Sequence, residues 1–562
     1  MRLLDSRRLT GPNLLWEKPG AVIDVEFGEL SPDLVIGAWE TEARRLLDAV
    51  EWKEEELCVR RFEGGASLAL SAPVDALYAA TEVNEAAWDA ARDFLDGSRR
   101  QLLQRVARGL KDEIRDEERP RLQRLMAAAQ EKSVPVVLDT DEVSLGLGKH
   151  SQCWELHAVP HPDDVEWSLL SRIPVAVITG TNGKTTTVRL MSSIGRAAGL
   201  TTGISSTDWL SVGGEIIEKD DYAGPEGARK ILRDRRCELA VLETARGGLL
   251  RRGLAVDHAD AALITNIAAD HIGEFGVQNL EELADVKWIV TRSLGDTGTL
   301  VLNADDPRLV ARAGSVNVPI IWFSPDPGNP VLREHLAAGG TCCTLNRGRI
   351  VLKQAASMQS VAPVDRIPIC FGGAARHNVA NAMAATALAH ALGIDRKAIR
   401  GGLEGMATDD NPGRANVYYV DGVKVLLDFA HNPHGMRAVM DMASQVEAKR
   451  RLLIIGQAGD RGDQDIRDLA GAAEGIHFDR VLIKRLDKYS RGRKQGEAAK
   501  MLREEFRKQD YKASQLAEHA SELGALRSAL RWANRGDLIL FLVHEDRDAA
   551  MSTLEKLQTG SN

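Results

Sequence analysis

The chain has 562 residues, 44 % of them hydrophobic and 27 % charged, so it is too long for one core and three or four domains are expected. Its net charge of −9 gives no general reason to expect a nucleic-acid partner, and the lack of a long apolar run argues against a membrane partner or a signal peptide. Six scattered cysteines without a Cys-x-x-Cys pair indicate a reduced, cytoplasmic protein.

The first part of the chain alternates short apolar runs with turns and then becomes helical. The runs at 21–25 and 66–70 predict strands, and from about 82 to 132 apolar residues recur at helical spacing. The run at 134–138 predicts another strand, and the glycine-containing segment 144–150 predicts a turn. We therefore expect an α+β N-terminal domain and its linker over residues 1–165.

The segment 180–187, Gly-Thr-Asn-Gly-Lys-Thr-Thr-Thr, follows the apolar run 175–178 and precedes a helical pattern. A strand, a glycine turn and a helix in this order wrap polyphosphate with backbone N–H groups and a helix N-terminus, and Lys184 adds a positive charge. Ile178 stands where the common P-loop spacing has its first glycine, so this is a compact variant. The loop residues expected to bind ATP are Gly180, Thr181, Asn182, Gly183, Lys184, Thr185 and Thr186.

Strands and helices alternate from residue 173 onward, which predicts a parallel sheet with helices on both faces over a central domain, 166–411. Ligands of such sheets lie at the carboxyl ends of the strands. Glu243 closes one predicted strand, and His271 follows the next, with Asp270 placed to orient its imidazole. Together with the hydroxyl of Thr185, Glu243 and His271 are the predicted magnesium ligands.

A second α/β unit begins after Asn411-Pro412-Gly413-Arg414. Apolar runs at 423–428, 451–456, 480–483 and 538–542 predict the strands of a Rossmann-like C-terminal domain over residues 412–562. Asp410 and Pro412 suit a domain junction, so we expect a hinge motion near 411–416, although Pro412 also fits an ordinary turn.

These motifs, in this order, resemble the Mur ligase family from about residue 173 to the C-terminus. The segment Arg376-His377-Asn378-Val379-Ala380-Asn381 is similar to the family's His-Asn-x-x-Asn helix, and 428–433 is similar to its C-terminal signature. The resemblance implies that Asn378 and Asn381 contact the adenine and its surroundings, that Arg414 reaches the phosphates and that Asp428 contacts the ribose. The residues that it implies to be catalytic are Lys184, Glu243, His271 and Lys287.

Lys287 stands where many members of the family carry a carbamylated lysine. Carbamylation converts the ammonium into a carboxylate-like metal ligand, which would help two magnesium ions to bridge ATP and the acceptor. A solvated lysine on a helix is the competing interpretation.

Within the family the closer resemblance is to cyanophycin synthetase, carried by the segments 8–13, 243–254, 456–465 and 491–493. That enzyme also contains an ATP-grasp domain, which needs on the order of 200 residues. Only about 18 residues separate Leu156 from Val175 in this chain. The resemblance therefore implies an enzyme without the backbone-building half, which does not make cyanophycin alone.

The implied activity is that of an ATP-dependent carboxylate–amine ligase that forms an acyl phosphate. It would join an amino acid, arginine or another basic one, to a carboxylate of a peptide or a cyanophycin-like polymer. The alternatives are a nucleotide-binding scaffold or regulatory subunit and a small-molecule ligase of the folylpolyglutamate-synthase kind. Further expected partners are a separate ATP-grasp ligase and other copies of the chain, as a homo-oligomer.

Substrate contacts are expected in loops that follow the predicted strands. The basic stretch 484–493, which includes Lys484, suits a carboxylate-rich substrate, and a solvated loop is the alternative. The expected substrate-binding residues are Asp221, Arg246, His431, Asn432, Asp460, Arg461, Arg491 and Arg493.

Overall fold

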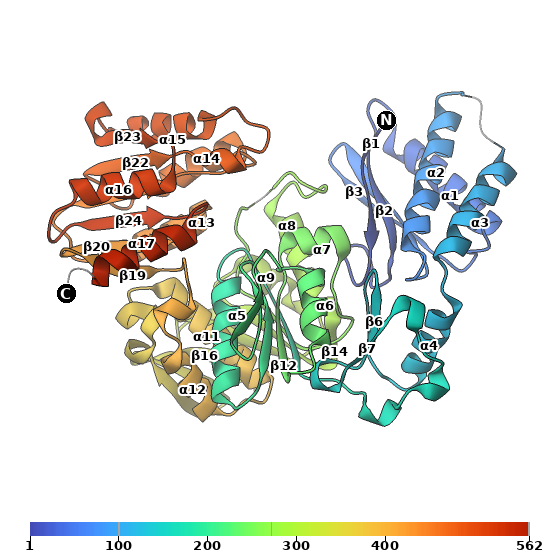
Figure 1. The fold of residues 1–562 in the computed structure, drawn as a ribbon, viewed down its shortest axis with the longest axis horizontal. Coiled ribbons are helices and arrows are strands. Elements are labelled where there is room, and N and C mark those ends of the chain that lie inside the picture. The colour runs from blue at the N-terminus through green and yellow to red at the C-terminus, as the bar shows by residue number, and fades with distance from the viewer. Residues whose placement is uncertain (99–101, 271, 560–562) are drawn as a thin grey trace.

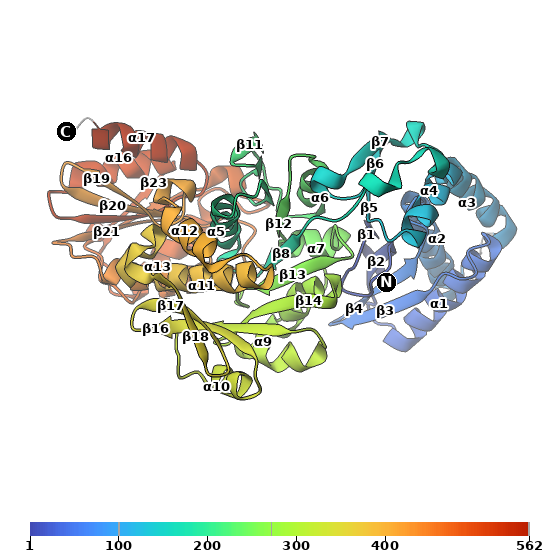
Figure 2. The same ribbon diagram turned by 90° about the horizontal axis from the view of Figure 1, so that it is seen from below.

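The computed structural model describes residues 1–98, 102–270 and 272–559. Three parts follow one another along the long axis of the molecule, and the two termini lie in the outer parts (Figure 1). Figure 2 gives the same arrangement from below. Each sheet falls inside one of the predicted ranges 1–165, 166–411 and 412–562, although the domain limits themselves stay a prediction.

The N-terminal part contains an antiparallel four-stranded sheet in the order β1-β2-β4-β3. Alternate strand residues and one face of each helix form its core, in which Trp39 and Trp88 are buried. Its elements are β1 (Arg2–Leu9), β2 (Gly20–Glu26), α1 (Pro32–Ala49), β3 (Leu57–Phe62), β4 (Gly65–Ser71), α2 (Leu77–Leu95) and α3 (Leu103–Glu117).

A small unit connects this part to the central sheet. It consists of α4 (Pro120–Glu131) and an antiparallel sheet of β5 (Val136–Leu138), β6 (Glu142–Leu145) and β7 (Gln152–Glu155). The prediction of a turn over 144–150 was wrong at its start, because Ser144 and Leu145 belong to β6 and pair with strands on both sides. The chain turns only afterwards, at the 3₁₀ helix Gly148–His150.

The central part is an eleven-stranded sheet in the order β11-β10-β9-β12-β8-β13-β14-β15-β16-β17-β18. The strands from β9 to β16 in this order are parallel, and antiparallel hairpins extend both edges. Its strands are β8 (Val175–Thr179), β9 (Thr202–Ser205), β10 (Leu210–Val212), β11 (Glu215–Glu218), β12 (Leu239–Glu243), β13 (Ala259–Ile264), β14 (Leu294–Asn303), β15 (Ile320–Ser324), β16 (Thr341–Asn346), β17 (Arg349–Gln354) and β18 (Ser357–Pro363).

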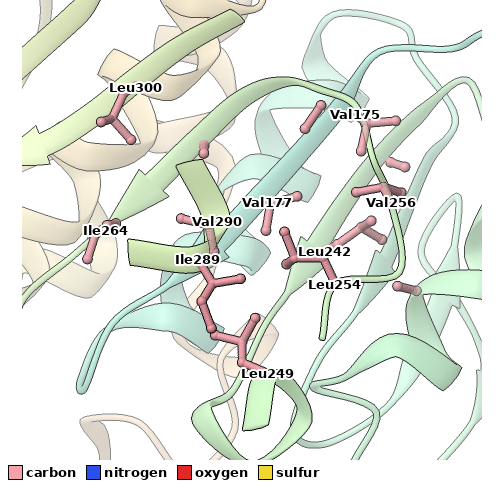
Figure 3. Close-up of a cluster of buried hydrophobic side chains, with 14 of the residues drawn as sticks. Val175, Val177, Leu242, Leu249, Leu254, Val256, Ile264, Ile289, Val290 and Leu300 are labelled. Carbon is pink, nitrogen blue, oxygen red and sulfur yellow. The ribbon is translucent and has the colours of Figure 1, made fainter. Parts of the chain in front are cut away.

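Helices cover both faces of the central sheet, because its strands are apolar on both faces. Val175 and Val177 of β8 join one core with α6, α7 and α8 (Figure 3), whereas Ala176 and Ile178 join the other with α5, α11 and α12. The helices are α5 (Lys184–Ala197), α6 (Pro225–Arg233), α7 (Arg246–Arg252), α8 (Leu280–Trp288), α9 (Pro307–Arg312), α10 (Pro330–Ala337), α11 (Arg376–Ala391) and α12 (Arg396–Gly405).

The C-terminal part is a six-stranded sheet in the order β19-β20-β24-β21-β22-β23, parallel except for β19. Helices pack on both of its faces, as expected for a Rossmann-like domain. Its elements are β19 (Asn416–Val420), β20 (Val423–Asp428), α13 (Pro433–Ser444), β21 (Arg451–Ile455), α14 (Asp463–Gly471), β22 (Arg480–Lys484), α15 (Glu497–Lys508), β23 (Leu516–His519), α16 (Glu522–Trp532), β24 (Leu538–Leu542) and α17 (Arg547–Thr559).

The predicted α/β class with a parallel central sheet is confirmed. Across the residues that the structure describes, no helix is both long enough and apolar enough to span a bilayer.

Candidate active site

The loop 180–183 connects β8 to the N-terminus of α5, as the sequence predicts for a phosphate-binding loop. Gly180 and Gly183 have positive φ values of 142° and 88°. A Cβ on Gly180 would lie 1.9 Å from Thr265 Oγ1, and one on Gly183 would lie 2.3 Å from Asn381 Oδ1. Both positions therefore require glycine, and the loop can present backbone N–H groups to an anion at the helix N-terminus.

The other loop residues are held by short polar contacts. Asn182 donates its backbone N–H to Asn266 Oδ1 at 3.0 Å, and its carbonyl accepts from Thr265 Oγ1 at 2.6 Å. Lys184 Nζ donates to the Thr181 carbonyl at 3.0 Å, so its ammonium lies beside the loop that is expected to bind the phosphates. Contacts within the protein therefore hold the phosphate-binding loop in its conformation.

Glu243 ends β12, the strand next to β8, and its side chain lies beside the first turn of α5. It is 1 % exposed and accepts hydrogen bonds from Thr185 Oγ1 at 3.2 Å and from Thr207 Oγ1 at 2.7 Å. A carboxylate and two hydroxyls form an oxygen donor set that suits Mg²⁺, which keeps most of its coordination for water and phosphate. The residues present thus fit the expected ion, although among the described residues no group of three His, Cys, Asp or Glu side chains forms a metal cluster.

The predicted ligand His271 lies outside the described residues. The carboxylate of its neighbour Asp270 contacts two side chains. Asp270 Oδ1 accepts a hydrogen bond from Arg461 at 2.7 Å, and its Oδ2 lies 3.6 Å from His431 Nε2. Two predicted substrate residues of the C-terminal part are thereby placed on the rim of the nucleotide site.

Lys287 of α8 is buried, which excludes the solvated alternative. Its Nζ donates to the Gly180 carbonyl at 2.9 Å, directly under the phosphate-binding loop. Burial and then the positive charge of Lys184 hold the pKa of Lys287 well below its ordinary value, against the opposing charge of Asp270. The neutral amine is the form that reacts with carbon dioxide, so the site favours the chemistry that carbamylation requires.

The two asparagines of α11 are buried next to the loop. Asn378 Nδ2 donates to the Ile369 carbonyl at 2.8 Å, and Asn381 Nδ2 donates to Asn378 Oδ1 at 3.2 Å. Asn381 also packs against Gly183, as its close approach to that Cβ position shows. Both residues border the cleft where the predicted adenine contacts would form.

The domain junction brings Arg414 and Asp428 to the same cleft. The Arg414 guanidinium lies 4.2 Å from the centroid of the Phe429 ring. The Asp428 carboxylate accepts the backbone N–H groups of Ala415 and Ala430, both at 2.8 Å, so it holds the turn that carries Arg414. Its predicted contact with a ribose stays a prediction.

The remaining predicted substrate residues differ in position. Asp221, Arg246, His431, Asp460, Arg461 and Arg491 line a continuous cleft of about 2960 Å³, which also contains the phosphate-binding loop, whereas Asn432 and Arg493 do not line it. Arg246 pairs with Glu274, and Arg491 pairs with Asp460. Arg493 donates to the Gly459 carbonyl at 2.8 Å and therefore supports the loop that carries Asp460.

Asn432 contacts the nucleotide loop instead of the cleft. Its Nδ2 donates to Asn182 Oδ1 at 3.0 Å, and its Oδ1 accepts from Asn182 Nδ2 at 3.2 Å. The side chain also caps α13 by accepting the N–H of Gly435 at 2.8 Å. A residue predicted to meet substrate thus joins the C-terminal part to the phosphate-binding loop.

Lys484 does not belong to a basic substrate-binding surface, and that prediction was wrong. It is fully buried, forms an ion pair with Glu522 and lies 3.0 Å from His544 Nδ1. Burial lowers its pKa well below the ordinary value, opposed by the charges of Glu545 and Asp546. The stretch 484–493 is therefore a mixture of core and surface.

The sequence interpretation missed a buried charge cluster between the central and C-terminal parts. Asp208, in the loop after β9, pairs with both Arg189 of α5 and Arg547 of α17. Arg189 also donates to Asn411 Oδ1 at 2.8 Å. Burial raises the pKa of Asp208, but the charges of Arg414, Arg189 and Arg547 outweigh it and leave the pKa below its ordinary value. The sequence signal was weak, because Asp208 follows a short strand that contains a single large apolar residue.

A P-loop at the switch from β8 to α5, a carboxylate on the neighbouring strand and a second α/β domain together define a nucleotide-dependent enzyme fold. The Mur ligase middle domain matches residues 178–389, and the "Mur ligase, glutamate ligase domain" matches residues 413–542. Because these ranges cover more than half of the chain, it belongs to the Mur ligase family, as the resemblance predicted.

Individual relatives agree with this assignment. The cyanophycin synthetase of a Synechocystis species is 40 % identical over 334 residues, which are 59 % of this chain and 38 % of that protein. A UDP-N-acetylmuramoyl-L-alanyl-D-glutamate–2,6-diaminopimelate ligase from Geobacter metallireducens is 28 % identical over 325 residues, 55 % of this chain and 60 % of that protein. The chain therefore spans less than two thirds of the length of these curated relatives.

Among solved structures, Escherichia coli FolC in complex with DHPP and ADP matches with a TM-score of 0.51. Its sequence identity is 20 %, and the match covers 69 % of this chain and 89 % of FolC. At this identity the likeness concerns the fold alone.

Proposed function

We propose that the protein is an ATP-dependent amide ligase that joins an amino acid to a carboxylate of a peptide or cyanophycin-like acceptor. The observation that supports this most directly is the shared cleft. The phosphate-binding loop, the buried Glu243 and side chains from all three parts of the chain line one continuous space. ATP, an acceptor carboxylate and an amine can therefore meet in one place.

The nucleotide is bound by groups from both α/β parts. Backbone N–H groups of the loop and the N-terminus of α5 face the phosphates, and Lys184 can swing from the Thr181 carbonyl to the β- and γ-phosphates. Asn378 and Asn381 border the adenine, and Arg414 approaches from the junction. Thr185 and Glu243 would hold Mg²⁺, with His271 as a further ligand, and the ion would supply charge neutralisation at the phosphates.

The reaction consistent with this arrangement has two displacements. An oxygen of the acceptor carboxylate bonds to the γ-phosphorus and ADP leaves, which gives an acyl phosphate. The amine then attacks the acyl carbon, phosphate leaves and the amine gives up a proton. Phosphorylation is needed because a carboxylate is otherwise a poor electrophile, and closure of the C-terminal part would keep water from the acyl phosphate.

The two substrates belong to different charge classes in this proposal. Asp221 lies in the cleft and suits a basic amino acid such as arginine. Arg246, Arg461 and Arg491 also line the cleft, and each would exchange its present carboxylate partner, Glu274, Asp270 or Asp460, for a carboxylate of the acceptor. Burial raises the pKa of Asp221, opposed by a backbone hydrogen bond from Ala223, and a cationic substrate beside it would favour the charged carboxylate.

The proposal also includes features that rest on the resemblance. These are two magnesium ions, a carbamylated Lys287, a homo-oligomeric assembly and a separate ATP-grasp ligase that supplies the acceptor. The proposed cytoplasmic location rests on the scattered cysteines, and the proposed domains at 1–165, 166–411 and 412–562 rest on changes of pattern along the chain. All six cysteines are free thiols, which agrees with a reducing compartment.

Phosphate release by the purified protein with ATP and Mg²⁺ tests the activity. The assay pairs each free amino acid with oligo-aspartate, β-aspartyl and γ-glutamyl peptides, and cyanophycin fragments. We expect release only with one acceptor and one amino acid together, and a product mass equal to their sum minus water. ATP binding without release in any pair would contradict the ligase and favour a nucleotide-binding scaffold.

A further inference from the structure

Two segments that are far apart in sequence interlock along one wall of the cleft. The end of β1 and the segment after it run along α7, and β1 and α7 lie side by side in both ribbon views (Figures 1 and 2). Thr10 N donates to the Arg252 carbonyl at 2.8 Å, and Leu254 N donates to the Pro12 carbonyl at 2.7 Å. A Cβ on Gly11 would lie 2.4 Å from the Leu254 carbonyl oxygen, so the backbones pack closely.

This interlock gathers three arginines from three elements: Arg8 of β1, Arg229 of α6 and Arg252 of α7. The Arg252 guanidinium donates to the Arg8 carbonyl at 3.3 Å, and Arg229 donates to Thr10 Oγ1 at 2.6 Å. The Arg8 guanidinium lies 3.4 Å from the centroid of the Tyr78 ring, which restricts its orientation. All three guanidinium groups line the same cleft as the phosphate-binding loop.

The cluster has more cations than anions. Among the described residues no carboxylate lies within ion-pair distance of Arg8 or Arg252, and Asp139 approaches Arg229 only to 3.9 Å. Burial and then the charge of Arg8 lower the pKa of Arg252. Burial also lowers the pKa of Arg229, where Asp139 opposes the charges of Arg233, Arg252 and Arg8. Partly buried like charges repel one another, and a bound anion relieves that repulsion.

The position of the cluster relates it to the reacting centre. α7 begins three residues after Glu243, and its seven residues rise by about 10 Å from Arg246 to Arg252. An extended peptide covers about 10 Å in roughly three residues. An extended acceptor that runs from the nucleotide along α7 would therefore place a residue a few positions from its reacting carboxylate beside the cluster.

We propose that Arg8, Arg229 and Arg252 form a subsite for a second, non-reacting carboxylate of the acceptor. The planar guanidinium forks suit a carboxylate in two-point contact, and the partial neutralisation by Asp139 suits a singly charged group. This inference rests on the proposed function and narrows its acceptor to an oligomer with several carboxylates. It also gives the N-terminal part a role in acceptor binding, since β1 contributes Arg8 to a site whose other two arginines come from α6 and α7.

Direct binding of fluorescein-labelled oligo-aspartate to the full chain tests the subsite without turnover. We expect Arg8→Gln and Arg252→Gln each to weaken binding by about ten-fold, as the loss of a charged hydrogen bond implies. Arg8→Lys keeps the charge but loses the planar fork, so it should bind more weakly than the wild type and more tightly than Arg8→Gln. Arg235→Gln, an exposed arginine outside the cleft, carries the same change in charge and should bind as the wild type does. Equal binding by all variants would overturn the subsite.

Two further measurements separate loss of the subsite from other causes of weaker binding, and identify the class of ligand. Melting temperature and ATP affinity must be unchanged in the variants, and Arg229→Gln provides a third, independent position if one of the others unfolds. Displacement of the probe by succinate and by pyrophosphate distinguishes ligand classes. Stronger displacement by pyrophosphate than by a dicarboxylate would overturn the assignment to a carboxylate.

The kinetics separate this subsite from the proposed ligase. The Arg8→Gln variant should raise the KM for oligo-aspartate by about ten-fold but leave the KM for an acceptor with one carboxylate unchanged. If the wild type is an active ligase and Arg8→Gln has the same KM for oligo-aspartate, the subsite is refuted and the ligase is not. If oligo-aspartate binding is weakened by Arg8→Gln and Arg252→Gln but the wild type forms no amide, the ligase is refuted and the subsite is not.

Discussion

The buried Asp208 cluster predicts a large loss of stability from a change of one atom type. The Asp208→Asn substitution keeps the shape of the side chain but removes its negative charge. The Arg189 and Asp208 side chains are 3 % and 8 % exposed, and that of Arg547 is 19 % exposed. Two guanidinium groups would thus lose their shared counter-ion where water cannot replace it. Removing one partner of a buried pair costs about 3–5 kcal/mol.

A matched control is available on the same arginine. Asp548 also pairs with Arg547 but is 70 % exposed, so Asp548→Asn should cost less than about 1 kcal/mol. By the usual scaling for domains of this size, Asp208→Asn should lower the melting temperature of the central domain by roughly 6–20 °C. Differential scanning calorimetry of both variants measures this directly. Equal melting temperatures for the two variants would refute the assignment of the cluster as a stabilising junction.

The pH dependence gives a second check on the same cluster. The folded-state pKa of Asp208 is lower than its value of 3.8 in an unfolded chain. Its stabilising contribution is therefore complete above that value and is lost as the pH falls through the folded-state pKa. The stability difference between wild type and Asp208→Asn should be constant from about pH 5 upward and should shrink only in stronger acid.

Three further predictions concern the nucleotide site. Lys184→Ala should reduce phosphate release by about 10²–10³-fold without lowering the melting temperature, and an active variant would contradict its catalytic role. Gly183→Ala should weaken ATP binding in calorimetry by about ten-fold, because of φ at 88° and the contact with Asn381, whereas Gly199→Ala, at φ 78° with open space around it, should not. Lys287→Met should abolish release and any ¹³C-bicarbonate-derived carbamate NMR signal; a signal that persists would exclude carbamylation of Lys287.

The nucleotide loop and Glu243 could be predicted from the sequence because their chemistry is local. The strand β8 is buried on both faces, so it reads as a continuous apolar run directly before the glycines. Glu243 is in register with Ile178 on the neighbouring strand, so the end of the next apolar run falls at the same edge. The local sequence pattern and the rule that parallel strands end at one edge of a sheet were therefore sufficient to predict the nucleotide loop and Glu243.

Lys484 and Asp208 could not be interpreted in this way because their partners are distant in sequence. Lys484 ends a strand and reads as a surface cation until Glu522 and His544 are brought against it. Asp208 follows the strand Thr202–Ser205, whose threonine, glycine and serine give a weak apolar signal. Its two arginines come from α5 and α17, and only the tertiary structure shows that all three charges are buried together.

The two outer parts of the molecule are attached to the centre in different ways, and from this difference we predict which of them moves. The N-terminal part is joined to α7 by backbone hydrogen bonds, which cannot rearrange without unpairing buried main-chain groups. The C-terminal part meets the nucleotide loop through side-chain pairs, Asn182 with Asn432 and Asp270 with Arg461. These two side-chain pairs can exchange for nucleotide or water at little cost, whereas the buried Asp208–Arg547 pair holds α17 to the central part and limits how far the C-terminal part can open. We therefore expect the proposed acceptor wall to stay fixed while a hinge at 411–416 moves the C-terminal part over the phosphate-binding loop.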